Sequence, residues 1–274
     1  MNYLFTTIYP GSKKFFEEFI KSVNNQTSKN FKLFIILNGT NLSKKYLKLI
    51  KTKFVIFKVN DTWQNARIRG LEFILKKRVN FIIFADSDDI LLNDRVEVIL
   101  NKVNKYDFIV NNMRLFKENL NQSKVWLKDK TRKIQLKEID DKNFIGCGNT
   151  AVRSSALKKI YKSINNRLIA FDWCMAKLLL INGFKGIYIK EPLTLYRQYQ
   201  QNTSSLTYVN KTKITRDIKC KLEHFDYFSK FGLNYEEKII KLKELKKKIK
   251  FNNYLKDNLK KFEKKNQKYW WAIV

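Results

Sequence analysis

The stretch "FIIFADSDDILL" at residues 81–92 joins an apolar segment to a cluster of carboxylates. Asp86, Asp88 and Asp89 follow it directly, in a chain that has 56 Lys and Arg but only 25 Asp and Glu. A strand this apolar is typical of a parallel sheet that helices cover on both faces. Ligands bind such sheets at the carboxyl ends of the strands, so we expect these carboxylates to lie in a binding site.

Short apolar strands alternate with longer helical patterns on both sides of this stretch. Their order predicts an α/β fold with a doubly wound, mainly parallel sheet. Residues 1–205 are interpreted as this α/β domain, and residues 206–274 as a basic, all-helical C-terminal extension. Strands are predicted at residues 2–9, 31–37, 53–59, 80–85 and 106–113. Helices are predicted at residues 13–25, from Asp61 or Thr62 to about residue 78, and at residues 172–182 before Gly183. A further strand is expected to enter a helix at Ser154 or Ser155, and residues 117–143 are expected to form a polar loop.

The net charge of +31 favours a negatively charged partner such as nucleic acid, an anionic membrane or a phosphorylated ligand. Of the 56 basic residues, 46 are Lys and only 10 are Arg. Base and phosphate readout favours the bidentate guanidinium of Arg, so an excess of Lys is equally typical of compositional drift. Both interpretations of the charge stay open at this point.

The rare residue types exclude several classes of chemistry. Cys147, Cys174 and Cys220 are isolated, which fits a reducing compartment and provides no disulfide framework. His224 is the only histidine, so zinc sites and His-based triads are excluded, and we expect it at the surface or half-buried. The first residues lack a signal-peptide pattern and no apolar run reaches about 18 residues. We therefore expect a cytoplasmic protein.

The spacing of Asp86 and Asp88 allows both side chains to face one site beyond the strand. Carboxylates this close repel each other unless a cation compensates, and Mg²⁺ or Mn²⁺ take carboxylate oxygens and bridge them to phosphates. The alternative is that Asp side chains favour a helix N-terminus, which suits Asp94 better. An EF-hand is excluded because Ile90 and Leu91 occupy positions that need an oxygen ligand and a glycine. No Walker A loop occurs.

Five segments resemble, in order, the family 2 glycosyltransferases, which are inverting enzymes of the GT-A fold that use nucleotide-diphospho-sugars. "FADSDD" resembles the D-x-D segment of that family, and "LFTTIYPGS" its first nucleotide-binding strand and loop. The other three segments are "NARIRGLEFI", which resembles the Ala-Arg-Asn-x-Gly-Leu helix, "FDWCMAKLLLINGFK", which resembles the Glu-Asp-Trp helix, and "EPLTLYRQYQQNTSS", which resembles the Tyr-Arg stretch. The resemblance covers residues 1–205.

The resemblance implies a role for each matching residue. Asp172 stands on the catalytic aspartate, which would accept the proton of an acceptor hydroxyl. Asp88 would hold Mn²⁺ or Mg²⁺, and Asp86 would contact the ribose or a metal-bound water. The other implied nucleotide-binding residues are Thr7 and Tyr9 in the nucleotide pocket, Asn38 at the base, and Arg67 and Arg197 at the diphosphate. The alternatives are a helix cap for Asp172 and a surface ion pair for Arg197.

Three positions depart from the family pattern. Leu37 and Asn38 replace the acid pair after the second strand, which weakens the expectation of uridine although Asn38 can still hydrogen-bond a base. Ile68 replaces an Asn. Phe171 replaces the Glu before the catalytic Asp, and its ring is expected to desolvate Asp172 and raise its pKa, as suits a general base.

The implied function is transfer of a sugar, with a UDP-sugar as the expected donor, to a glycan or lipid-linked glycan in bacterial surface polysaccharide synthesis. Two alternatives stay open: a nucleic-acid-binding protein, disfavoured because D-x-D carboxylates repel phosphate, and a non-catalytic binding or scaffold protein. In the extension, Ile239, Leu242, Leu245 and Ile249 form an apolar stripe among lysines. This stripe is expected to pack on the α/β domain or on the second subunit of a homodimer. The alternative is a peripheral position on the inner face of the cell membrane, with Tyr269, Trp270 and Trp271 among the lipid headgroups.

Overall fold

A single curled sheet forms the centre of the computed structural model, which describes residues 1–199, 202, 206, 209–266 and 268–272. The strand order is β3-β2-β1-β4-β9-β6-β10-β5, with β7 beside β6 and β8 beside β10. The strands are β1 (Tyr3–Ile8), β2 (Lys32–Asn38), β3 (Phe54–Val59), β4 (Phe81–Phe84), β5 (Ile90–Leu91), β6 (Phe108–Phe116), β7 (Lys124–Val125), β8 (Arg132–Lys133), β9 (Thr150–Arg153) and β10 (Gly186–Arg197).

The first four strands of this order are parallel, whereas β9 runs antiparallel to both β4 and β6. In the register of β1 and β4, Phe5 lies opposite Phe84. Two residues further along the chain, Thr7 near the end of β1 and Asp86 beyond the end of β4 therefore lie at the same edge of the sheet. The predicted doubly wound, mainly parallel α/β sheet is confirmed, and its polar strand ends meet where the sequence analysis expected a site.

Helices cover both faces of the sheet and create two apolar cores. One core packs α1 and α4 against the sheet, and the other packs α3, α5, α6 and α7. The α-helices are α1 (Phe16–Asn24), α2 (Lys44–Lys48), α3 (Trp63–Leu75), α4 (Arg95–Leu100), α5 (Ser154–Ile160), α6 (Phe171–Ile181), α7 (Lys211–Ser229), α8 (Glu236–Lys248) and α9 (Asn252–Asn266), and short 3-10 turns lie at Lys13–Phe15, Leu120–Gln122, Leu136–Ile139, Cys147–Asn149 and Tyr161–Ser163.

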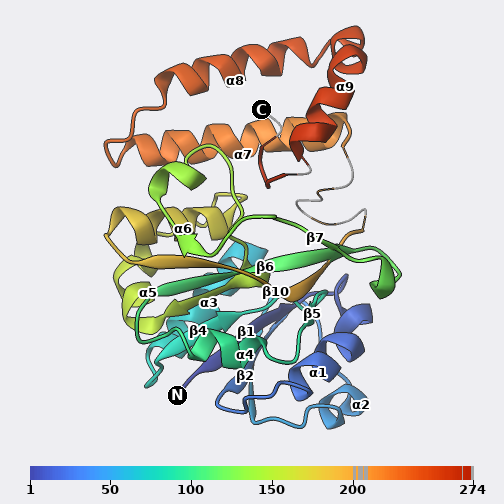
Figure 1. Cartoon of the computed structure of the whole chain (residues 1–274), viewed down its shortest axis with the longest axis vertical. Coiled ribbons are helices and arrows are strands. Elements are labelled where there is room, and N and C mark those ends of the chain that lie inside the picture. The colour runs from blue at the N-terminus through green and yellow to red at the C-terminus, as the bar shows by residue number, and fades with distance from the viewer. Residues whose placement is uncertain (200–201, 203–205, 207–208, 267, 273–274) are drawn as a thin grey trace.

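Helices α7, α8 and α9 form a layer at one end of the molecule, beyond α6 (Figure 1). The apolar stripe of α8 faces this layer, because Leu242 and Ile249 are buried in the same core as α6. Of the two expected packing surfaces, the structure shows the chain's own core, and the second subunit of a homodimer stays a prediction. The boundary at residue 205 stays a prediction, since residues 203–205 and 207–208 lie outside the described residues.

Some local predictions were wrong. His224 is 1% exposed and stacks on Trp173 with ring centroids 3.8 Å apart, so the expected surface or half-buried position is incorrect. The predicted helix at residues 13–25 starts as a 3-10 turn, and α1 begins only at Phe16. Strand β10 was not predicted. Among the described residues, no helix is long and apolar enough to cross a membrane.

Candidate active site

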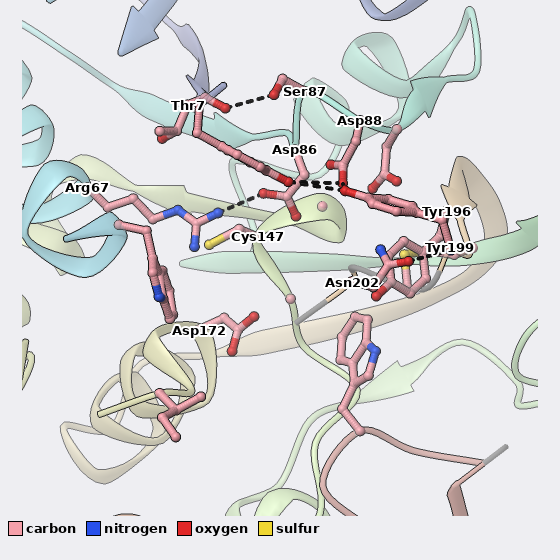
Figure 2. Close-up of a pocket in the computed structure, with 18 of the residues that line it drawn as sticks. Thr7, Arg67, Asp86, Ser87, Asp88, Cys147, Asp172, Tyr196, Tyr199 and Asn202 are labelled. Atoms are coloured by element: carbon pink, nitrogen blue, oxygen red, sulfur yellow. Dashed lines mark hydrogen bonds and ion pairs between the residues drawn. The ribbon is translucent and has the colours of Figure 1, made fainter. Parts of the chain in front are cut away.

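A cavity of about 330 Å³ opens at the carboxyl ends of β1 and β4 (Figure 2). The hydroxyl of Ser87 donates a 2.8 Å hydrogen bond to the carbonyl of Thr7, which ties the two strand ends together. Chain segments far apart in the sequence contribute the lining: Thr7, Tyr9, Trp63, Arg67, Asp86–Asp89, Met113, Gly146–Gly148, Ile169, Asp172, Tyr196, Tyr199, Asn202, Trp270 and Trp271.

Asp86 is held by the guanidinium of Arg67, which lies 2.8 Å from its Oδ1 atom. Arg67 projects from α3 and lies 5.2 Å from the ring centroid of Trp63 and 5.9 Å from that of Phe171. Aromatic faces stabilise a cation, so this arrangement fixes a positive charge beside Asp86. The Oδ2 atom of Asp86 faces Gly148. A Cβ atom added to Gly148 would lie 3.2 Å from this oxygen and 2.7 Å from the Oδ2 atom of Asp89. Only glycine lets the chain approach both carboxylates this closely.

Asp88 is 8% exposed and accepts hydrogen bonds from two tyrosines at the rim of the cavity. The hydroxyl of Tyr199 lies 2.7 Å from its Oδ2 atom and that of Tyr9 lies 3.4 Å from the same atom. Burial and the charge of Asp86 raise the pKa of Asp88. The Asp88 carboxylate therefore carries negative charge that the protein compensates only in part.

Asp89 completes the acidic cluster in the cavity lining. Its Oδ1 atom accepts a 3.0 Å hydrogen bond from the backbone of Arg197, whereas its buried Oδ2 atom has no hydrogen-bond partner among the described residues. Burial, followed by the charges of Asp88 and Asp86, raises the pKa of Asp89 well above its ordinary value. The buried carboxylates thus make this edge of the sheet attractive to a cation.

The donor set fits a hard divalent cation that keeps ligands from outside the protein. Within the described residues, no group of three His, Cys, Asp or Glu side chains is arranged to hold a metal by itself. Asp86 is paired with Arg67, whereas Asp88 accepts hydrogen bonds from Tyr199 and Tyr9 and has no salt bridge among the described residues. Mg²⁺ and similar ions are commonly bound by one or two carboxylates together with substrate phosphates and waters.

Asp172 lies in the first turn of α6, on the opposite wall of the cavity (Figure 2). Burial raises the pKa of its carboxyl to about 6, against the opposing effect of Arg67 and of backbone amides of Trp173 and Cys147. The direction of this shift agrees with the rise expected for a carboxyl beside Phe171. The N-cap position of α6 is Ala170, and the Asp172 Oδ1 atom accepts a 2.8 Å hydrogen bond from the adjacent Trp173 amide. Asp172 is therefore not the N-cap residue of α6, although its carboxylate accepts from an amide of the first turn.

Two residues implied by the resemblance lie outside the cavity lining. The Arg197 side chain is 9% exposed, donates to the carbonyl of Asp88 at 2.9 Å and pairs with Glu18 behind the cavity. Asn38 ends β2, and its side chain bonds the backbone N–H and carbonyl of Asp61 at 3.0 Å each. By contrast, Thr7, Tyr9, Arg67, Asp86, Asp88 and Asp172 all line the cavity, as the resemblance implied.

Other lining residues were not predicted from the sequence. Tyr199 reaches Asp88 across 111 residues, and no local pattern marks it. Gly146 and Gly148 stand two apart in a chain with only eight glycines, a spacing that could have indicated close backbone approach. Trp270 and Trp271 are 6% and 3% exposed, so neither ring lies at the surface, where the membrane alternative had placed both. They pack into the cavity wall instead.

Comparisons with known proteins agree with this architecture. The model of "Glycosyl transferase family 2" matches residues 5–161. A structure of S. aureus TarS 1–349 with UDP-GlcNAc has a TM-score of 0.59 at 16% identity and covers 80% of this chain and 65% of that chain. The structure of S. aureus TarS has a TM-score of 0.56 at 14% identity and covers 82% of this chain and 43% of that chain. This chain therefore spans less than two thirds of either TarS structure, and at such identities the likeness concerns the GT-A fold. No curated protein matches the chain.

Proposed function

The chain belongs to glycosyltransferase family 2, and we propose that it transfers a sugar from a nucleotide-diphospho-sugar, with UDP as the nucleotide, to a hydroxyl of a glycan or lipid-linked glycan. The TarS structure with UDP-GlcNAc supports a UDP-sugar as the first donor to test. A role in bacterial surface polysaccharide synthesis stays a prediction from the family resemblance.

The observation that carries this proposal is that two carboxylates with different surroundings, Asp88 and Asp172, line the same cavity. Asp88 lies among acidic neighbours beyond the end of β4, whereas Asp172 lies on the opposite wall with a pKa of about 6. A general base near that pKa is ionised at neutral pH and can still accept a proton during reaction. Arg67 lies in the electrostatic field of both Asp86 and Asp172 and would bring positive charge to a bound diphosphate.

The proposed reaction is a single displacement at the anomeric carbon. Asp172 accepts the proton of the acceptor hydroxyl while the acceptor oxygen forms its bond to that carbon. The bond between the carbon and the diphosphate oxygen breaks, and the nucleoside diphosphate leaves with the electron pair. Attack from the side opposite the leaving group inverts the configuration. A divalent cation such as Mn²⁺ or Mg²⁺, held by Asp88 and the diphosphate, would stabilise the charge of the leaving group.

A thermal-shift screen of UDP-glucose, UDP-N-acetylglucosamine, UDP-galactose and GDP-mannose, each with Mn²⁺ or with EDTA, tests this proposal. A ligand at 100 times its Kd stabilises the native state by about 2.7 kcal/mol, which raises Tm by several degrees. We expect one UDP-sugar to do so and to require Mn²⁺ for the full effect. Asp88→Ala should remove the dependence on Mn²⁺.

Asp94→Ala is the matched control, because Asp94 is an exposed carboxylate at the start of α4 and lies outside the cavity. It should respond to donor and Mn²⁺ as the wild type does. The proposal fails if no nucleotide-sugar changes Tm under either condition. An equal dependence on Mn²⁺ in Asp88→Ala would remove Asp88 from the cation site.

A further inference from the structure

Residues 268–272 return to the α/β part of the molecule and complete the cavity. Asn143 and Trp270 exchange two backbone hydrogen bonds of 2.9 Å each, which form an antiparallel bridge. This bridge places Trp270 and Trp271 in the cavity lining. A segment distant in sequence from every family motif therefore contributes a wall of the candidate active site.

The Trp270 indole is tightly fixed. Its ring centroid lies 4.6 Å from that of Trp126 and 5.6 Å from that of Tyr196. On another side it contacts Gly146, where an added Cβ would lie 2.7 Å from the indole ring. A wall held from several sides does not need to reorganise when a ligand binds, which favours affinity.

The backbone of the next residue is strained. Trp271 has a φ of +59°, in the left-handed region that is unfavourable for a bulky side chain. Such a conformation persists only where the surroundings enforce it, and it is commonly found at binding sites. The Trp271 side chain is 3% exposed, and Lys213 of α7 places its Nζ atom 5.9 Å from the ring centroid.

The cavity thus has two chemically different parts. Asp86, Asp88 and Arg67 supply charge for a diphosphate and its cation. The part formed by Trp270, Trp271 and Tyr196 presents the exposed parts of aromatic rings, and C–H groups pack favourably against such rings. A pyranose ring presents such C–H groups on one face and hydroxyls at its edge.

We propose that Trp270 and Trp271 form a subsite for a sugar ring of the acceptor. The inference rests on the proposed function, because it assigns the charged part of the cavity to the nucleotide-sugar. The acceptor ring packs on the aromatic wall, in the same cavity as the base Asp172. The acceptor is accordingly a glycoside whose reacting residue is itself a sugar.

Saturation-transfer NMR on the full chain with UDP and Mn²⁺ tests this assignment with simple probes. The probes are the methyl glycosides of glucose, galactose, N-acetylglucosamine and rhamnose. We expect saturation transfer to the ring C–H protons of at least one probe. Trp270→Ala should weaken binding of that probe at least tenfold, and Trp270→Phe, which keeps a flat face without the N–H donor, should have a smaller effect.

Two further variants separate the subsite from general damage to the segment. Gly146→Ala keeps both tryptophans but forces the indole of Trp270 to move, so it should weaken probe binding as well. Tyr269→Ala is the matched control, because Tyr269 packs on Lys142 and Phe144 outside the cavity lining and should bind the probe normally. Calorimetric titration of UDP should give the same Kd for all variants, which also shows that they are folded.

Three results overturn the subsite: no probe binds a protein that still binds UDP, the probe binds Trp270→Ala as tightly as the wild type, or Trp270→Ala weakens UDP-sugar binding as much as probe binding. The last result would place the donor sugar on the wall. If the glycosides bind as expected while no nucleotide-sugar does, the proposed transferase function fails and the sugar subsite stands.

Discussion

Asp172 combines a reactive position with an environment that opposes its charge. Because Asn keeps the shape of the side chain but cannot accept a proton, Asp172→Asn should leave donor binding nearly intact. Turnover should fall by roughly 10²–10⁴-fold, the usual contribution of a general base. The loss should appear equally in kcat and kcat/KM, as for an interaction made only in the transition state. A product assay with calorimetric donor titration measures both, and near-normal turnover would show that Asp172 is not the base.

The same carboxylate gives a stability prediction with a defined sign. The folded-state pKa of about 6 exceeds the ordinary value of 3.8, so the native state binds this proton more tightly than the unfolded state. The stabilisation is complete below about pH 4 and is lost as pH rises through 6. Asp172→Asn should therefore have a higher Tm than the wild type above pH 6, and the difference should disappear near pH 4. Thermal unfolding across this pH range measures it, and a constant difference would contradict the burial argument.

A property of a single residue can be predicted from the sequence when the residues that cause it are close to it in the chain. Phe171 adjoins Asp172 in the chain, so desolvation of that carboxylate could be predicted. The D-x-D carboxylates follow a recognisable strand, so their place at the sheet edge could be predicted too. The hydroxyl of Tyr199 on Asp88 and the salt bridge from Arg197 to Glu18 depend on long-range folding, and no short pattern encodes them.

At the scale of elements, periodicity identified the buried parallel strands but not β10. Its sequence "GIYIKEPLTLYR" at residues 186–197 contains Pro192, and its pairing with β6 shifts register on both sides of that residue. Proline lacks an N–H donor and is typical of bulges, so the pattern looked unlike a central strand. The return of Trp270 to Asn143 was equally hidden, because a two-residue bridge has no periodicity.

The contact between α6 and α7 leads to a second stability prediction. His224 of α7 stacks on Trp173, and neither ring nitrogen has a hydrogen-bond partner among the described residues. Burial, with the charges of Lys177 and Lys221, lowers the pKa of His224 well below 6.5. The unfolded chain therefore takes up a proton below pH 6.5 that the native state rejects, and stability falls on that side.

His224→Phe keeps a flat ring on Trp173 and removes the titratable group. Its loss of unfolding free energy between pH 7.5 and 5.0 should be smaller than that of the wild type, as urea titration at both pH values would measure. His224→Gln serves as a polar, non-titrating comparison that should also show the smaller pH dependence at lower overall stability. An unchanged pH dependence in both variants would mean that other groups cause the loss of unfolding free energy at acid pH.

For the whole molecule, the open question is the partner of its positive charge. The α8–α9 layer exposes Ile240 by 51% and Phe251 by 70%, beside exposed lysines such as Lys247 and Lys248. Cations around isolated apolar side chains are typical of proteins that lie on anionic membranes. This surface is separate from the buried Trp270 and Trp271. Peripheral membrane binding therefore stays a prediction, and its expected contact surface is now the one around Ile240 and Phe251.

Liposome flotation with and without anionic lipid tests this location. The wild type should float with anionic vesicles only, and less so at high salt, because salt screens the attraction between lysines and headgroups. Phe251→Ser should weaken flotation because it removes the exposed ring, whereas replacing Lys247 and Lys248 by Gln should weaken it by roughly 1 kcal/mol per charge. The same variants distinguish membrane binding from the nucleic-acid alternative, in which Phe251 has no role. Nucleic acid would be the partner of the positive charge if the protein does not float and if a gel shift of duplex DNA depends on the lysines but not on Phe251.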